Sequence, residues 1–262
     1  MGWISLDGAA NVRDLGGLPT GNGQRTRPGK LIRSDNLQDL TEQDIHELVE
    51  RWHVKRVVDL RTQLEVDNDG PGPLTRDPRV STHHLSLIPE AGDTTDVTAA
   101  EEEPPVVLPW PNSRTQVREQ RGPVATYLRY LEDRPDSIVE ALRLVGQTIG
   151  ATIVNCAAGK DRTGVVVALA LDEVGVDRNA IVDDYIRTGD HLERLLRRLA
   201  RSSTYAEDVE TLEVDKHMPR PETMRELLAE IDRIYGGTSA WLRSHGWSDD
   251  DATALRRALL EP

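Results

Sequence analysis

The sequence predicts an α/β domain with a small, mostly parallel central sheet flanked by helices and a helix-rich C-terminal half. Three observations lead to this prediction. The segments 54–60 and 152–154 are apolar and β-branched, which is typical of buried strands. Strand-like segments alternate with helical patterns in the first half of the chain, as in α/β domains. From residue 123 onward helical patterns dominate.

The first half of the chain contains the expected strands and one expected helix. Thr41, with Asp44 three residues later, is typical of a helix start, and this helix should end near residue 52. The segment that precedes Cys156 should form a further strand. The other expected strands are 31–34, 54–60 and 82–88.

The C-terminal half should be almost entirely helical. Its apolar residues recur at helical spacing, and no internal repeat is present. The expected helices are 124–132, 137–148, 165–174, 178–187, 191–200, 222–235, 239–244 and 249–260.

Residues 89–122 differ in composition from the rest of the chain. They contain the acidic cluster 101–103, several prolines and many small polar residues. Such a segment cannot bury enough apolar surface to form part of a core. We therefore expect a single domain over residues 1–262, into which 89–122 is inserted as a mobile lid.

The charge of the chain limits the partners that we expect. The formal net charge is −13, and the pI is near 5.0. Such a surface repels nucleic acid and anionic membranes, although a local basic pocket can still bind a phosphate. No stretch approaches the roughly 18 apolar residues that span a bilayer, so stable membrane insertion is not expected.

Cysteine use and the N-terminal residues bear on location. The single cysteine excludes an internal disulfide, which suits a reducing compartment. Residues 1–10 lack the basic and apolar segments of a signal peptide. A cytoplasmic location is expected, with export by a route without a signal peptide left open. The oligomeric state stays undetermined.

The lone cysteine, Cys156, lies between a predicted strand and a predicted helix. Backbone N–H groups of a tight turn that closes onto a helix N-terminus can bind a phosphate. Arg162 would add a planar fork that matches two phosphate oxygens. The same positive environment favours the thiolate form of Cys156, which is the nucleophilic form. These residues predict phosphate-ester chemistry at a cysteine.

Two neighbours of Arg162 complete this predicted chemistry. Thr163 is placed to donate a hydrogen bond to the thiolate. Asp161 can protonate the departing ester oxygen and then activate the hydrolytic water. No cofactor and no metal are expected. A Walker loop is excluded, because Val154 and Asp161 stand where it needs Gly and Ser or Thr.

The segment 156–164 resembles the active-site loop of Cys-dependent phosphatases. Its Lys-Asp-Arg version is similar to that of the atypical bacterial tyrosine and lipid phosphatases. The resemblance covers nearly the whole chain and is poorest over 89–122, where that family has a lid over the active site. Further segments similar to motifs of the family are 11–17, 31–34, 58–61, 181–185, 231–236 and 241–243.

The resemblance implies the Cys-phosphatase fold and a phosphocysteine mechanism, with Cys156 as nucleophile, Arg162 as phosphate clamp and Asp161 as acid. Lys160 adds positive charge, as in Cys-dependent lipid phosphatases. Glu90 falls where the family has an acidic residue proposed as an additional acid. The implied phosphate-binding residues are Ala157, Ala158, Gly159, Lys160, Arg162 and Thr163.

Two residues outside this set have less defined roles. The family has His before the cysteine, whereas this chain has Asn155, which cannot carry charge. Lower activity or a shifted pH optimum would follow. Arg13 either supports the phosphate-binding loop or forms a local ion pair in a turn.

Three functions remain compatible with the sequence. The first is a protein-tyrosine phosphatase, with phosphotyrosine proteins as substrates and broader activity on phosphoserine, phosphothreonine or phosphoinositides left open. The second is a phosphatase of phosphoinositides or inositol phosphates, which Lys160 favours. The third is a phosphate-binding module without hydrolysis, which Asn155 favours and the presence of Cys156, Asp161 and Arg162 disfavours.

Overall fold

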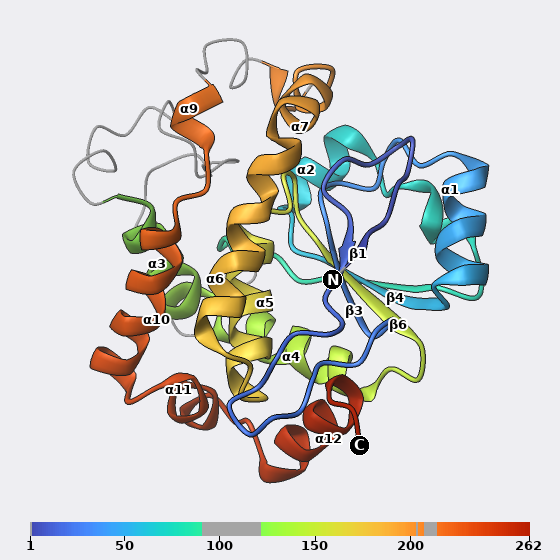
Figure 1. Cartoon of the computed structure of the whole chain (residues 1–262). Helices are drawn as coiled ribbons and strands as arrows, with labels where there is room; N and C mark the ends of the chain where they lie inside the picture. Colours follow the sequence, from blue (N-terminus) through green and yellow to red (C-terminus); the bar gives the residue numbers. More distant parts are fainter. Residues whose placement is uncertain (1, 91–121, 203, 207–213) are drawn as a thin grey trace.

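The computed structural model describes residues 2–90, 122–202, 204–206 and 214–262 (Figure 1). Within these ranges six strands form one sheet in the order β1-β2-β3-β6-β4-β5. The strands are β1 (Gly2–Trp3), β2 (Arg13–Asp14), β3 (Leu31–Ser34), β4 (Val54–Asp59), β5 (Ser81–His84) and β6 (Ala151–Asn155).

The sheet is mostly parallel, as predicted. Strands β3, β6, β4 and β5 run parallel to one another, and the short β1 and β2 add an antiparallel edge. The sequence did not indicate β1 and β2. Asn155 is in register with Ser34 on one side and with Asp59 on the other. The carboxyl ends of the three central strands therefore meet at one edge, where ligands of α/β sheets bind.

The helices agree closely with the predicted ones. Thr41 caps α1 in a capping box with Asp44, and the helix continues as a π-helical segment. The helices α2, η2 and α9 were not predicted, and the strand expected at 82–88 ends at His84. The elements are α1 (Glu42–His46), η1 (Glu47–Arg51), α2 (Gln63–Asp69), η2 (Pro73–Arg76), α3 (Gly122–Asp133), α4 (Pro135–Gln147), α5 (Asp161–Glu173), α6 (Arg178–Ile186), η3 (Arg187–His191), α7 (Leu192–Leu199), α9 (Val214–His217), α10 (Pro221–Tyr235), α11 (Thr238–Ser244) and α12 (Asp249–Leu259).

Each face of the sheet covers a separate apolar core, because successive side chains of a strand point to opposite faces. The larger core lies under the helices from α3 to α6 and from α10 to α12, and includes Leu31, Val58 and Val154. The smaller core lies on the face covered by α1 and the N-terminal segment, and includes Ile32, Val57 and Ile153. The helix-rich C-terminal half thus forms one thick layer on one side of the sheet (Figure 1).

The lid expected at 89–122 lies outside the described residues except for Pro89, Glu90 and Gly122. No helix in the described part of the chain is long and apolar enough to cross a membrane.

Candidate active site

The loop 156–160 joins the end of β6 to the start of α5. Cys156 is the first residue after β6, and Asp161 is the first residue of α5. Gly159 has a φ of 63°, and a Cβ there would lie 2.4 Å from the carbonyl oxygen of Ser34. Only glycine fits at this point, because the loop passes against the end of β3 in a left-handed conformation.

The carbonyl groups of the loop are bound from the side of β3 and the N-terminal segment. Asn11 Nδ2 donates to the carbonyl oxygens of Ala158 at 2.9 Å and Gly159 at 3.2 Å. The backbone N–H of Asn36 donates to the carbonyl of Ala157 at 3.1 Å. In a trans peptide the C=O and N–H point in opposite directions. The N–H groups of residues 158–160 therefore point away from these partners, as an anion-binding turn requires.

A buried network of ions holds Asn11 and the loop in place. Asp184 of α6 accepts hydrogen bonds from Arg13 Nε at 2.7 Å and Arg33 Nη1 at 2.6 Å. Arg13 also donates to the Asn11 side chain, and Arg33 to the carbonyl of Gly159. Burial alone would raise the pKa of Asp184, but the Arg13 and Arg33 guanidiniums hold that pKa below its ordinary value of 3.8. Arg13 thus reaches the loop through Asn11 and Asp184.

Arg162 is buried and oriented by a carboxylate from α2. Its two terminal nitrogens donate to the oxygens of Glu65 at 2.6 and 2.8 Å, the paired geometry that suits a guanidinium. Tyr205 Oη also donates to Glu65, at 2.7 Å. Burial would lower the pKa of Arg162, but Glu65 first, and Cys156 to a smaller degree, raise it well above its ordinary value. Arg162 therefore stays a cation in a fixed orientation.

Asp161 accepts a hydrogen bond from the hydroxyl of Tyr127 on α3. The single proton of Tyr127 is used in that bond, so Tyr185 Oη, at 2.9 Å, donates to Tyr127. Burial and the neighbouring Asp161 raise the pKa of Tyr127 well above 10.0, and Tyr127 remains a donor at all working pH values. Two phenols thus position the carboxyl group of Asp161.

Lys160, the last residue of the loop, and Thr163 of α5 differ in their hydrogen bonding. Lys160 Nζ donates to the carbonyl of His217 at 3.1 Å and lies 3.8 Å from Asp161 Oδ1. Thr163 is buried, and its hydroxyl makes no hydrogen bond with a described residue. The bond expected from Thr163 to Cys156 is therefore absent from this structure.

Asn155, which precedes the cysteine, is tied to the end of β4. Its Nδ2 donates to Asp59 Oδ1 at 3.2 Å, and Asp59 is itself paired with Arg61 at 2.7 Å. The Oδ1 of Asn155 is buried and has no hydrogen-bond partner among the described residues. Asn155 therefore connects Cys156 to a buried ion pair without adding charge.

Glu90 lies at the first turn of α2. Its side chain accepts a hydrogen bond from the backbone N–H of Gln63, the first residue of that helix. The structure thus places Glu90 beside the helix that carries Glu65.

Sequence reasoning missed the residues that position the predicted site. Thr62 and Glu65 form a capping box at the start of α2, and this spacing was a usable signal for the helix. No comparable local signal marks Tyr127, Tyr185 or Asp184, because each reaches the loop from a helix elsewhere in the chain. In the part of the chain that the structure describes, no group of three or more His, Cys, Asp or Glu side chains could hold a metal ion.

A parallel strand, a tight loop that begins with cysteine and a helix that begins with Asp-Arg-Thr define the class of Cys-dependent phosphatases. The model of the tyrosine phosphatase family matches residues 4–261. The chain belongs to this family, which confirms the resemblance found in the sequence.

Two named relatives agree with this assignment. The triple specificity protein phosphatase PtpB of Mycobacterium tuberculosis is 30% identical over 278 residues, covering 97% of this chain and 98% of that protein. A tyrosine-protein phosphatase of Nostoc commune is 27% identical, covering 87% of this chain and 74% of that protein. Among solved structures, the core catalytic domain of the PP-IP phosphatase SIW14 of S. cerevisiae is 14% identical with a TM-score of 0.38, covering 91% of this chain and 98% of that chain.

Proposed function

We propose that the chain is a protein-tyrosine phosphatase that hydrolyses phosphomonoesters through a cysteinyl phosphate on Cys156. The observation that supports this most strongly is the loop 156–160, whose carbonyl groups accept hydrogen bonds from Asn11 and Asn36. Arg162 lies in the first turn of α5, directly after this loop, and its charge interacts with Cys156. Several donors and a fixed cation at one point match the charge of a phosphate monoester.

In the first step, the N–H groups of the loop and Arg162 bind the phosphate oxygens. The Cys156 thiolate attacks phosphorus, so that an S–P bond forms while the P–O bond to the leaving group breaks. Asp161 gives its proton to the departing oxygen. Arg162 stabilises the charge on the phosphoryl oxygens during transfer.

In the second step, water attacks the phosphocysteine. Asp161, now a carboxylate, takes a proton from this water, the S–P bond breaks, and inorganic phosphate and the thiolate are released. Tyr127 and Glu65 act here as positioning residues for Asp161 and Arg162. Because the thiol must stay reduced, this mechanism supports a cytoplasmic location.

Phosphotyrosine proteins are the proposed substrates. The family assignment supports them, and the triple specificity named for the M. tuberculosis relative supports a broader range. Lys160 favours phosphoinositides or inositol phosphates as the second candidate, because it adds a cation beside Asp161. A phosphate-release assay with phosphotyrosine, phosphoserine and phosphoinositide substrates distinguishes these candidates.

The nucleophile is tested by alkylation, since Cys156 is the single thiol of the chain. We expect iodoacetate to abolish release of phosphate from an aryl phosphate, in proportion to one carboxymethyl group per chain measured by mass spectrometry. Inorganic phosphate should protect the enzyme. Cys156→Ser should be inactive with chelator present or absent. Full activity of the alkylated enzyme or of Cys156→Ser would exclude the mechanism.

A binding measurement, made beside the phosphate-release assay, tests the third function, a phosphate-binding module without hydrolysis. Tight binding of a phosphotyrosine peptide by the wild-type protein, without release of phosphate from any substrate of the panel, would favour that function over catalysis.

A further inference from the structure

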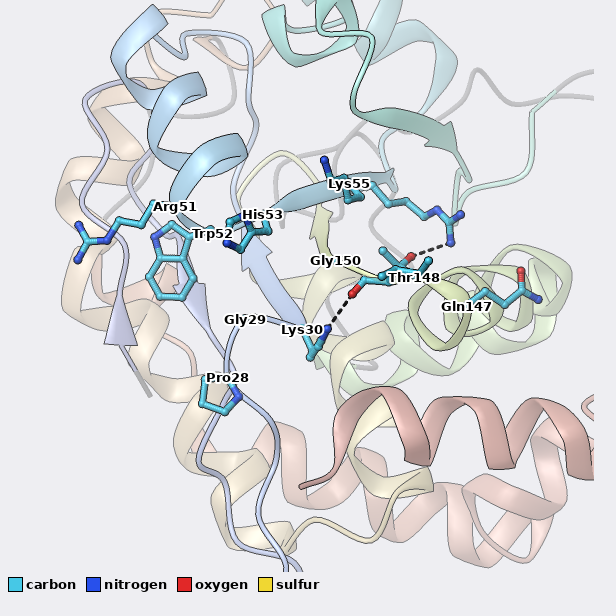
Figure 2. A pocket seen from close by; sticks show the side chains of 12 residues that line it. Pro28, Gly29, Lys30, Arg51, Trp52, His53, Lys55, Gln147, Thr148 and Gly150 are labelled. Atoms are coloured by element: carbon cyan, nitrogen blue, oxygen red, sulfur yellow. Dashed lines mark hydrogen bonds between the residues drawn. The ribbon is translucent and has the colours of Figure 1, made fainter. Parts of the chain in front are cut away.

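A cavity of about 900 Å³ lies at the end of the sheet opposite to Cys156. Figure 2 shows the residues that line it. It is found where β3, β4 and β6 begin, whereas Cys156 follows the point where β6 ends. None of the residues that the proposed catalysis uses lines it. Its lining includes Lys30, Trp52, His53, Lys55, Arg56 and Ile149.

The cavity is cationic in a chain whose formal net charge is −13. Its lining contains two lysines, two arginines and one histidine, but no aspartate or glutamate. Lys30 Nζ donates to the carbonyl of Ile149 at 2.8 Å, and Arg56 donates to Thr148 at 2.7 Å. These acceptors are neutral, and neither side chain forms an ion pair within the described ranges. The charge of Lys30 therefore has no carboxylate partner there, and that of Arg56 is offset only in part, by the nearby Glu140, so the lining favours an anion.

The two arginines of the lining differ in whether a carboxylate compensates their charge. Arg51 pairs with Glu47 at 3.2 Å, so its charge is largely compensated. The Nε of Arg56, in contrast, is buried and donates to no described atom. Buried donors without acceptors are rare in folded proteins, and a water, an ion or another bound group can satisfy them.

The backbone that carries these side chains is hydrogen-bonded to the central strand β6. The N–H groups of Ala151 and Thr152 donate to the carbonyls of His53 at 3.0 Å and Lys30 at 2.9 Å, which extends the sheet to the cavity. His53 has a φ of 52° and is the one non-glycine residue with positive φ in the described part of the chain. Such strained conformations cluster at functional sites. The cations thus project from fixed positions, which suits specific binding.

One wall of the cavity is apolar. Trp52 is held by a hydrogen bond from its Nε1 to Glu47 at 3.1 Å, and Figure 2 shows its ring beside His53. Ile149 is 93% exposed. We propose that this cavity binds a small organic anion, in which one phosphate, sulfonate or carboxylate group is attached to an apolar ring. The volume lies in the range of small-molecule sites, and the concave shape suits a small ligand.

The test follows the side-chain N–H resonance of Trp52 in a ¹⁵N spectrum, assigned with Trp52→Phe. The probe is naphthalene-2-sulfonate, which combines an anion with an apolar ring. We expect a saturable shift of the Trp52 resonance and none for Trp241 or Trp247. Inorganic sulfate and uncharged naphthalene-2-methanol should bind about tenfold more weakly. Sulfate lacks the apolar ring, and naphthalene-2-methanol lacks the anionic group.

Substitutions show whether the probe binds in this cavity or elsewhere on the protein. Lys30→Gln with Lys55→Gln should weaken probe binding about tenfold or more, as expected when charge-assisted contacts are lost. Arg225→Gln on α10, which removes the same charge outside the cavity, should bind the probe as wild type does. The single exchange at the exposed Lys55 serves if the double variant does not fold. No saturable shift in the wild type, or equal affinity in the lysine variants, would overturn the proposal.

Discussion

Glu65 and Arg162 form a buried ion pair in which both carboxylate oxygens accept hydrogen bonds, at 2.6 and 2.8 Å, from the terminal nitrogens of the guanidinium. The pair connects α2 to the first turn of α5, and both side chains are fully enclosed. The pair fixes the orientation of the Arg162 guanidinium, because the guanidinium cannot rotate without breaking two charge-assisted hydrogen bonds. The proposed phosphate clamp therefore depends on a helix that the sequence analysis did not predict.

Exchange of Glu65 for Gln should impair phosphate binding. The variant keeps the size of the side chain but leaves the buried Arg162 without its counter-charge and misaligned, so kcat/KM should fall about 100-fold. Inhibition by inorganic phosphate should weaken in parallel. Glu193→Gln, which breaks the exposed pair with Arg197, is the matched control and should have no effect. Unchanged phosphate inhibition in Glu65→Gln would contradict the orienting role.

Exchange of Asp161 for Asn should affect substrates according to their leaving groups. The variant cannot donate a proton, so turnover of aryl phosphates with poor leaving groups should fall about 10²–10⁴-fold. Good leaving groups, such as nitrophenolate, need less protonation and should be affected much less. The measurement is kcat across a series of phenols of different acidity. Equal losses over the whole series would remove Asp161 as the acid.

Tyr127→Phe should have a weaker form of the same effect. The phenol donates to Asp161, and its loss leaves the carboxyl group less well positioned. We expect about a tenfold decrease for poor leaving groups and little change for good ones, with a loss of about 1 kcal/mol in stability. Tyr235→Phe on α10 is the matched control. A decrease that is independent of the leaving group would indicate a structural role alone.

Asp184 should make the fold less stable as the pH falls into the acidic range. Its pKa is held below 3.8 in the folded state, so below that pH the unfolded chain binds a proton that the folded chain does not. The contribution of Asp184 is present above pH 3.8 and is lost as the pH falls through its folded pKa. Asp184→Asn should cost about 3–5 kcal/mol at pH 7, because two buried arginines lose their counter-charge.

Urea unfolding at a series of pH values tests this expectation. The difference in free energy of unfolding between wild type and Asp184→Asn should narrow as the pH is lowered below 3.8. A difference that stays constant down to pH 2 would show that the ionised carboxylate does not provide the stability.

Asn155→His should extend activity to lower pH. An imidazole at this position would lie beside the buried Asp59, which favours its protonated form. The added positive charge next to Cys156 would favour the thiolate. A cavity of about 140 Å³, lined in part by Asn155, Asp59 and His84, offers room for the larger ring. The acidic limb of the kcat/KM profile should move to lower pH; an unchanged profile in a folded variant would contradict this.

The sequence alone determined the local parts of this protein. The strand, loop and helix around Cys156 follow from a short apolar run, a glycine and a helical pattern, and the capping box at Thr41 follows from two side chains three residues apart. Each of these depends on neighbours along the chain, so the local sequence contains the information. The family motifs added the expected roles of Cys156, Asp161 and Arg162.

Only the tertiary structure decided which side chains position these groups. Glu65 is 97 residues from Arg162, Tyr127 is 34 residues from Asp161, and Asp184 is 171 residues from Arg13. Such contacts depend on strand order and on how helices dock against the sheet, and neither is written in a local pattern. The same reason applies to the cationic cavity, because two separate segments, 28–30 and 51–56, bring their lysines and arginines together only where the parallel strands begin.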